Sequence, residues 1–407
     1  MPDVKVPHGA KKTLSHVAGN LEVESGAIIT PEADAVTVDG RLETEGDVVF
    51  TGALKVREID GDDGDLEVRG DLTVEHNVSI EDGSLSVSGS LTAHNIDVDR
   101  DLLVLRDVTA DDLDVGSRAE IRGRLKARSV DVGGSLEVHE STELDEIDVG
   151  GSVRLMKSVT CRTIDVGGSV IVGGGKITDQ IDVGGSFEST ASLEFNVLEV
   201  GGSVQLNGDS SGRQIDVGGV VRVAGNLRFE DMDVGGTIEI DGNAEGSDVD
   251  IGGFFKVGGN LNLTGQLEVG GKCRVDGTVN ADRIEIGGAI EATQVQADRI
   301  EVGGLIATEK GVKADSIEIG DRGRARGPLV GDSIEIGEKA DVEDLFGKTI
   351  TMEERSRARL VHGVDLRLES GSRIQGEVLY TGSLDVEDDV TFAVEPKKVD
   401  SLPAAPL

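Results

Sequence analysis

A short motif of the form I-D-V-G-G-S recurs through the middle of the 407-residue chain, and its spacing restricts the fold more than any other feature. Eleven of the thirteen intervals between successive copies are 17 residues, and the other two are 18 and 16. So regular a period predicts one structural unit stacked many times, as in a solenoid. The first glycine of each copy falls at positions 116, 133, 150, 167, 184, 201, 218, 235, 252, 270, 287, 303, 320 and 337.

A single period, residues 147–163, shows how the unit folds. Alternating apolar and polar residues predict short strands with one buried face, and three such runs occur in the period. The phase breaks at Gly150-Gly151, where we expect glycine to supply the positive φ of a sharp corner. The sequence therefore predicts an all-β fold, a single-stranded right-handed parallel β-helix with about 17 residues per three-sided coil. The predicted inward residues of this period are Ile147, Val149, Val153, Leu155, Val159 and Cys161.

The alternation continues with looser spacing on both sides of the regular repeat. It predicts a β-helix solenoid over residues 21–394, with roughly 20 coils and a length on the order of 100 Å. Residues 1–20 are mixed polar and are predicted to form an N-terminal tail or cap. Residues 395–407 contain proline and are predicted to form a disordered C-terminal tail.

The composition excludes several classes of function. A net charge of −38 argues against a broad nucleic-acid surface, and 2% aromatic residues are too few to stack bases or sugars. Two cysteines give no disulfide framework. No apolar run approaches the ~20 residues that span a bilayer, and none of signal-peptide length begins the chain. We therefore expect a cytoplasmic protein. Abundant Asp and Glu with scarce Lys are typical of extreme halophiles, in which molar salt screens repulsion.

One outward position of the motif strand carries a carboxylate in fifteen successive coils. Neighbours ~4.8 Å apart repel by ~0.9 kcal/mol even at the dielectric constant of water. Three interpretations fit this acidic row: a solvated halophilic face, a stripe that binds cations, or a docking face for a basic partner. The row consists of Asp97, Asp114, Asp131, Asp148, Asp165, Asp182, Glu199, Asp216, Asp233, Asp250, Glu268, Glu285, Glu301, Glu318 and Glu335.

Two groups of arginines near the C-terminal end alternate outward in a stretch that carries no net charge. They are either ordinary exposed strand positions or a contact surface for anionic lipid or for another acidic chain. This candidate basic patch consists of Arg322, Arg324, Arg326, Arg355, Arg357 and Arg359.

Motifs that carry chemistry are scarce. The six histidines lack metal-ligand spacing, and Cys161 and Cys273 fall on inward positions. The glycine pairs link strand to strand and do not form a phosphate-binding loop. We expect no catalytic, cofactor-binding or metal site, and no enzyme activity. Polysaccharide cleavage, which long β-helices also perform, needs long loops and aromatic side chains that stack on sugars. The nearly constant period leaves no room for long loops, and only 2% of the residues are aromatic.

Two stretches carry a resemblance to a known family. IEIGEKADVEDLFGKTITMEERSRA (334–358) and LESGSRIQGEVLYTGSLDVEDDVTF (368–392) resemble the bactofilins, which are polymer-forming cytoskeletal proteins. With the acidic composition, the chain looks like a haloarchaeal member of the kind called halofilins. The resemblance implies nucleotide-independent end-to-end filaments, a role in cell shape, and recruitment to the inner face of the cell membrane. Many bactofilins carry an apolar N-terminal membrane-binding segment, and residues 1–12 do not resemble one.

The ends of a β-helix favour self-assembly independently of that resemblance, because an open coil has unpaired backbone groups and an exposed core. Val390, Phe392 and Val394 are the candidate residues of an end-to-end polymer interface. The sequence thus predicts a self-assembling scaffold whose main partner is itself, with a membrane-bound protein as a further partner. The alternative is a non-polymerising β-helical adaptor that binds a basic or membrane-bound partner along its acidic face.

Overall fold

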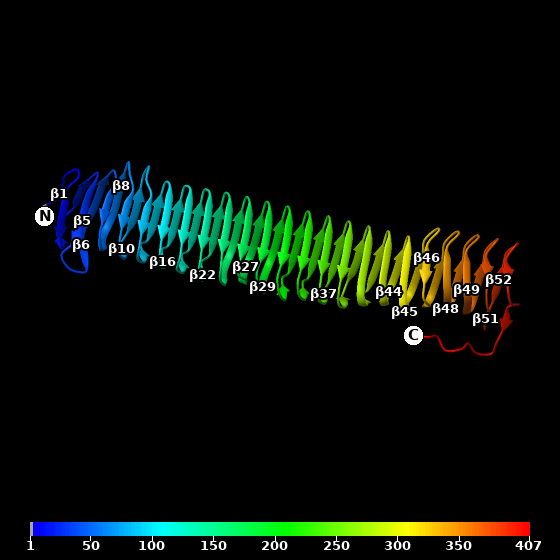
Figure 1. Ribbon diagram of the computed structural model, residues 1–407. Coiled ribbons are helices and arrows are strands. Elements are labelled where there is room, and N and C mark those ends of the chain that lie inside the picture. The colour runs from blue at the N-terminus through cyan, green and yellow to red at the C-terminus, as the bar shows by residue number, and fades with distance from the viewer. Residues whose placement is uncertain (1–2) are drawn as a thin grey trace. The chain divides into compact units, whose positions relative to one another are not determined.

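The computed structural model describes residues 3–407, in which it has β-strands and no helix. The fold is an all-β parallel solenoid of about 23 turns, with about 17 residues in each turn. The chain divides into two compact units, Met1–Gly202 (unit 1) and Ser203–Leu407 (unit 2). Within each unit the strands stack edge to edge, as Figure 1 shows.

The strands of unit 1 are β1 (Val4–Val6), β2 (Lys11–Leu14), β3 (His16–Val17), β4 (Leu21–Glu24), β5 (Ala27–Pro31), β6 (Ala35–Glu45), β7 (Val48–Phe50), β8 (Ala53–Asp62), β9 (Leu66–Val68), β10 (Leu72–Val74), β11 (Asn77–Ile80), β12 (Leu85–Val87), β13 (Leu91–Thr92), β14 (Asn95–Val98), β15 (Asp101–Val104), β16 (Val108–Thr109), β17 (Asp112–Val115), β18 (Arg118–Ile121), β19 (Leu125–Lys126), β20 (Ser129–Val132), β21 (Ser135–Val138), β22 (Thr142–Glu143), β23 (Glu146–Val149), β24 (Ser152–Leu155), β25 (Val159–Val166), β26 (Ser169–Val172), β27 (Gly175–Val183), β28 (Ser186–Ser189) and β29 (Leu193–Val200).

The strands of unit 2 are β30 (Ser203–Leu206), β31 (Ser210–Ser211), β32 (Gln214–Val217), β33 (Val220–Val223), β34 (Leu227–Arg228), β35 (Asp231–Val234), β36 (Thr237–Ile240), β37 (Ala244–Gly246), β38 (Asp248–Ile251), β39 (Phe254–Val257), β40 (Leu261–Leu263), β41 (Gln266–Val269), β42 (Lys272–Asn280), β43 (Arg283–Ile286), β44 (Ala289–Val302), β45 (Leu305–Ile319), β46 (Arg324–Arg326), β47 (Leu329–Ile336), β48 (Asp341–Met352), β49 (Arg357–Leu368), β50 (Arg373–Ile374), β51 (Val378–Tyr380), β52 (Leu384–Val386), β53 (Thr391–Phe392) and β54 (Lys397–Lys398).

Three consecutive strands make one turn, and each strand pairs in parallel with its counterpart in the next turn. In unit 1, β17, β18 and β19 pair with β20, β21 and β22, and every partner lies 17 residues further on. We call the sheet of the motif strands the first sheet, and the following strands of each turn form the second and third sheets. Long strands such as β45 bend at a corner and belong to more than one sheet.

The inward positions form the core as the alternation predicts. In the period that begins at Ile147, all six predicted inward side chains are at most 2% exposed. Cys161 and Cys273 are among the buried residues, so the prediction that they act as small core side chains is confirmed. Each core residue stacks on its equivalents in the turns before and after, which removes its apolar surface from water.

The glycine pairs at the corners are required for a different reason from the one that the sequence suggests. Among the described residues, the glycines with positive φ all lie outside the repeated pairs. Instead, successive corners stack too closely for a side chain: a Cβ on Gly151 would lie 2.3 Å from the Gly134 carbonyl oxygen. A Cβ on Gly168 would lie 2.1 Å from the Gly151 oxygen. The prediction of a positive φ at these corners is therefore wrong, and the close contact between stacked corners favours glycine there instead.

At both ends of the chain, strands pair outside the segment that the sequence predicts as solenoid. β1, β2 and β3 pair with β4, β5 and β6, so residues 4–17 form a full turn inside the segment predicted as a tail or cap. Charged residues between buried Val6 and Val17 obscure the alternation there. At the other end β54 pairs with β51, and residues 399–407 then lie along the third sheet. These additions bring the solenoid to about 23 turns rather than roughly 20.

Candidate functional site

The last turn of unit 2 leaves core positions incompletely covered. It consists of β52, β53 and β54. The apolar residues of β52 and β53 continue columns of core residues, and in the turn before them the residues of these columns are at most 2% exposed. In the last turn, Val386 is 39% exposed, and Leu384 and Phe392 are half-buried. The register stacks Leu384 on Leu366, Val386 on Leu368 and Phe392 on Ile374.

The three residues predicted from the sequence as an end interface all lie in this turn. Val390 and Phe392 are half-buried, and Val394 is 54% exposed. The strands β52, β53 and β54 pair with β49, β50 and β51, and no other strand within residues 3–407 pairs with their opposite edges. An uncovered core beside three free strand edges is a template for the addition of further parallel strands.

Unit 1 begins with an equivalent edge. Its first turn consists of β1, β2 and β3, which belong to the first, second and third sheets in the same order as the strands of the last turn of unit 2. Val4 and Leu14 are half-buried at this edge, whereas Val6 is fully buried.

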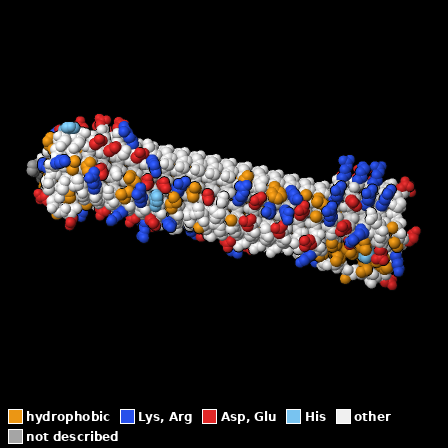
Figure 2. All heavy atoms as spheres, viewed as in Figure 1, with side chains coloured by type: hydrophobic (Ala, Val, Ile, Leu, Met, Phe, Trp, Pro, Cys, Tyr) orange, Lys and Arg blue, Asp and Glu red, His pale blue; other side chains and the backbone are white. Residues whose placement is uncertain are grey.

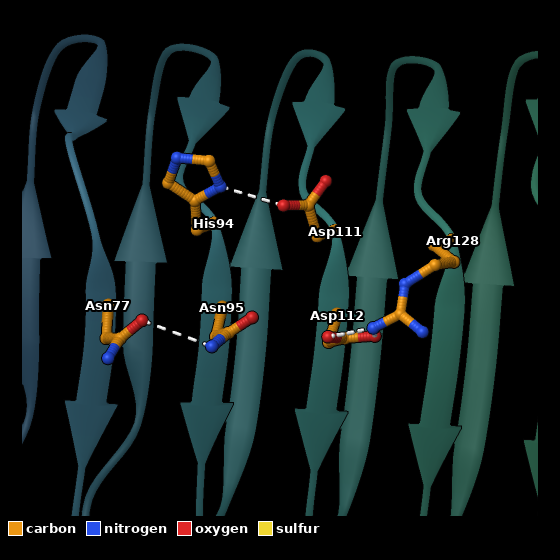
Figure 3. A network of polar contacts seen from close by, with 6 residues as sticks. All are labelled: Asn77, His94, Asn95, Asp111, Asp112 and Arg128. Carbon is orange, nitrogen blue, oxygen red and sulfur yellow. Dashed lines mark hydrogen bonds and ion pairs between the residues drawn. The ribbon is translucent and has the colours of Figure 1, made fainter.

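The acidic row lies on the first sheet, with its outward carboxylates exposed except for four half-buried members, Glu199, Glu285, Glu301 and Glu318. In unit 1 the register aligns Asp114, Asp131 and Asp148 directly above one another. From Asp97 to Asp182 the row makes no ion pair or hydrogen bond with any described residue. Polar side chains beside the row do contact one another between turns. Figure 3 shows these contacts, which join Asn77 to Asn95, His94 to Asp111 and Asp112 to Arg128.

Partial burial and then repulsion between neighbouring carboxylates raise the pKa of three members of the row. The pKa of Asp148 is raised above its ordinary value of 3.8, first because partial burial disfavours the charge and then because Asp131 and Asp165 repel it. The pKa of Asp114 is raised in the same way by partial burial and then by Asp97 and Asp99. In unit 2, partial burial and then Glu301 and Glu335 raise the pKa of Glu318 above 4.5. The sequence-based expectation of a repulsive row therefore has a structural basis.

Part of the acidic row in unit 2 borders a shallow groove of about 410 Å³ between successive turns of the first sheet. Six carboxylates line it, and none of them forms an ion pair with a described residue. Further along the row, by contrast, Arg283 pairs with Glu285 and Arg299 pairs with Glu301. The six are Asp216, Asp231, Asp233, Asp248, Asp250 and Glu268.

The six arginines of the candidate basic patch are all exposed on unit 2, but they do not form one continuous column. Asp341 lies between Arg324 and Arg357 in the second sheet. Arg359 is held in an ion pair by Asp344. The structure adds two cations that the sequence analysis missed, Lys339 and Arg373, and Figure 2 shows the Lys and Arg side chains gathered along the last turns.

The sequence analysis also missed an outward column on the third sheet, where Val330, Phe346, His362 and Leu379 follow one another in successive turns. Two adjacent apolar residues, such as Leu345-Phe346, break the alternation and could have revealed it. His362 is 6% exposed, its ring meets the Phe346 ring edge-on at 5.3 Å, and its Nε2 lies 3.1 Å from the Glu377 carboxylate.

Other chemistry is sparse within residues 3–407. No group of three or more His, Cys, Asp or Glu side chains there is arranged to hold a metal ion. Burial raises the pKa of the Cys161 and Cys273 thiols to about 12, which keeps them in the unreactive protonated form. In the part of the chain that is described, no helix has the length and apolar character needed to cross a membrane.

Comparison with known proteins assigns no family to the chain: no protein-family model, curated protein or solved structure matches it. At the level of the fold, the chain is a β-solenoid protein of about 23 turns.

Proposed function

We propose that this protein is a self-assembling cytoskeletal scaffold that forms nucleotide-independent, end-to-end filaments and takes part in shaping the cell. The proposal rests chiefly on the last turn of unit 2, in which Val386 and Val394 are exposed and Phe392 is half-buried, beside three strand edges that no described strand covers. Unpaired strand edges and exposed core residues promote association between molecules, so an end of this kind favours self-assembly.

The order of the strands favours a head-to-tail contact between copies. If the last turn of one copy meets the first turn of the next, β52, β53 and β54 can continue onto β1, β2 and β3 without changing sheets. Such a contact joins two different surfaces, and a heterologous contact that does not close into a ring generates an open filament.

The more specific proposal is a bactofilin-like scaffold, and within that group a haloarchaeal, halofilin-like protein. It is supported by the resemblance of residues 334–358 and 368–392 and by the acidic composition. On this proposal the protein is cytoplasmic, and a membrane-bound partner recruits the polymer to the inner face of the cell membrane.

The test is electron microscopy of the purified protein in about 2 M KCl without nucleotide. We expect filaments from the native chain and their loss in a Phe392→Arg variant that keeps its β-sheet circular dichroism. An unpaired charge buried in an interface costs about 3–5 kcal/mol, which raises the critical concentration by roughly two to three and a half orders of magnitude. Met156→Arg is the matched control, because Met156 is an apolar residue of unit 1 that is 42% exposed away from both end turns. Filaments that persist in Phe392→Arg would remove the last turn from the interface.

A second candidate function is an adaptor that does not polymerise and binds a basic or membrane-bound partner along the acidic row. The observation that favours it is the groove in unit 2 lined by six carboxylates without ion pairs. Single particles at every protein concentration, together with salt-sensitive binding of a basic polypeptide that is lost in Asp233→Asn/Asp250→Asn, would support the adaptor over the scaffold.

A further inference from the structure

The outward column of the third sheet changes character near the end of unit 2. Along most of the unit this column is polar, as expected for a face exposed to water. Four successive turns then carry Val330, Phe346, His362 and Leu379, which we call the apolar column. The preceding residues of the same column are Ser211, Arg228, Glu245, Asn262, Asn280, Gln296 and Lys313, and the residue that follows is Lys397.

The C-terminal strap, residues 399–407, covers this column. After β54 the chain turns back and runs beside the strands of the preceding turns, as Figure 1 shows, and Figure 2 shows apolar side chains gathered in the same region. Leu379 is only 7% exposed although it points away from the core. The far end of the strap is anchored where Leu407 Cδ1 lies 2.8 Å from the position that a Cβ of Gly311 would occupy, next to Pro328. The strap residues that are half-buried are Val399, Leu402, Ala405 and Leu407.

The length of the strap matches the length of the column. Five turns separate Lys397 from Lys313, which corresponds to about 24 Å at the usual spacing of paired strands. Nine extended residues reach at most about 30 Å. The strap therefore spans the four apolar turns and ends on the turn before them.

Side-chain contacts alone hold most of the strap in place. The Val399 amide donates a hydrogen bond to the Tyr380 carbonyl oxygen at 2.9 Å. Beyond it, residues 400–407 make no hydrogen bond with any other residue that the structure describes. Releasing residues 400–407 thus breaks no hydrogen bond to another described residue and leaves the turns below them intact, so the same segment of another molecule can take their place.

We propose that the apolar column is a docking site for the C-terminal strap of a second copy of this chain, and that exchange of straps ties two solenoids together side by side. The strap seated on the column defines the ligand: an extended apolar segment with side chains at the spacing of Val399, Leu402, Ala405 and Leu407. Exchange of an identical segment between copies is a low-cost route to association. The contact lies on the side of the solenoid, so it is independent of the end-to-end contact proposed above.

The test uses full-length chains that carry single engineered cysteines, since the two natural cysteines are buried. A Leu407→Cys copy is mixed with a Pro328→Cys copy under mild oxidation, both in the Phe392→Arg background so that end-to-end contacts do not contribute. Strap exchange predicts a disulfide-linked heterodimer on a non-reducing gel, at a yield at least about tenfold above random collision. The collision control pairs Leu407→Cys with Met156→Cys, whose position is exposed on unit 1.

Specificity is tested with Phe346→Lys in the copy that carries Pro328→Cys. This change places a charge in the middle of the apolar column and is expected to reduce the heterodimer to the control level, while circular dichroism shows that the solenoid is folded. A heterodimer yield no higher than with Met156→Cys overturns the proposal, and so does a yield that Phe346→Lys leaves unchanged. Neither result bears on the filaments, which are scored separately in the native background.

Discussion

Neutralising three neighbouring carboxylates of the acidic row should stabilise the protein at low salt and have almost no effect at high salt. The variant is Asp131→Asn/Asp148→Asn/Asp165→Asn in unit 1. These residues are stacked in register with Asp114 before them and Asp182 after them. No ion pair among the described residues offsets their charges, so the substitutions remove repulsion without breaking a favourable contact.

The magnitude follows from the spacing of the turns. The three substitutions abolish four repulsive contacts between neighbours, each about 0.9 kcal/mol at ~4.8 Å in unscreened water. With a Debye length of ~30 Å, at about 10 mM salt, the sum is about 3 kcal/mol. With a Debye length of ~3 Å, at about 1 M salt, it falls to about 0.7 kcal/mol.

Thermal melting followed by circular dichroism measures the effect. The unfolding entropy of about 2.1 cal/mol/K per residue converts 3 kcal/mol into a Tm increase of about 4 °C if the whole chain melts together, and about 7 °C if unit 1 melts alone. At about 1 M KCl the increase should be under about 2 °C. The matched control is Asp131→Glu/Asp148→Glu/Asp165→Glu, which keeps all three charges and should gain nothing at low salt.

Two results would refute this reasoning. An equal gain in Tm at low and high salt would mean that the asparagines act through packing or hydrogen bonding rather than charge. The absence of a gain at low salt would mean that bound cations already neutralise the row, which would favour the cation-binding interpretation over the solvated one.

Three further predictions follow from the same structure. At low salt, Tm should rise as pH is lowered from neutrality toward the ordinary range of carboxylates, because Asp114, Asp148 and Glu318 have raised pKa values and the folded state therefore takes up protons first. At still lower pH, Tm should fall again as carboxylates such as Glu67, whose pKa Arg69 lowers, are protonated and lose their ion pairs. A continuous fall from pH 7 would contradict this. Gly151→Ala should cost about 2–5 kcal/mol, measured by urea unfolding, because its Cβ would lie 2.3 Å from the Gly134 oxygen; a loss below about 0.5 kcal/mol would show that the corners can separate. Cys161 and Cys273 should react with a thiol reagent only after unfolding, since both thiols are buried with pKa values of about 12, and rapid labelling of the native protein would contradict that burial.

Much of the architecture could be predicted from the sequence because a solenoid converts spacing along the chain into contact in space. A period of 17 residues places residue i on residue i+17, so the core columns and the acidic row follow from counting. Ile147, Val149 and their equivalents are buried where alternation places them. The sequence also predicts an open end coil, and in the last turn Val386 and Val394 are 39% and 54% exposed.

The sequence by itself therefore determined the repeat, the inward and outward faces, and the rows of like charge. Only the tertiary structure decided why glycine is favoured at the corners. The reason is that a side chain on Gly151 would collide with the carbonyl group of Gly134, and this contact cannot be read from the spacing of the repeat. The tertiary structure also decided that residues 4–17 pair as a turn and that residues 399–407 return over the apolar column. The pairing of residues 4–17 is disguised by the charged side chains among them. The contact of the strap lies outside the repeat altogether, because its position depends on where the chain turns back after the last strand.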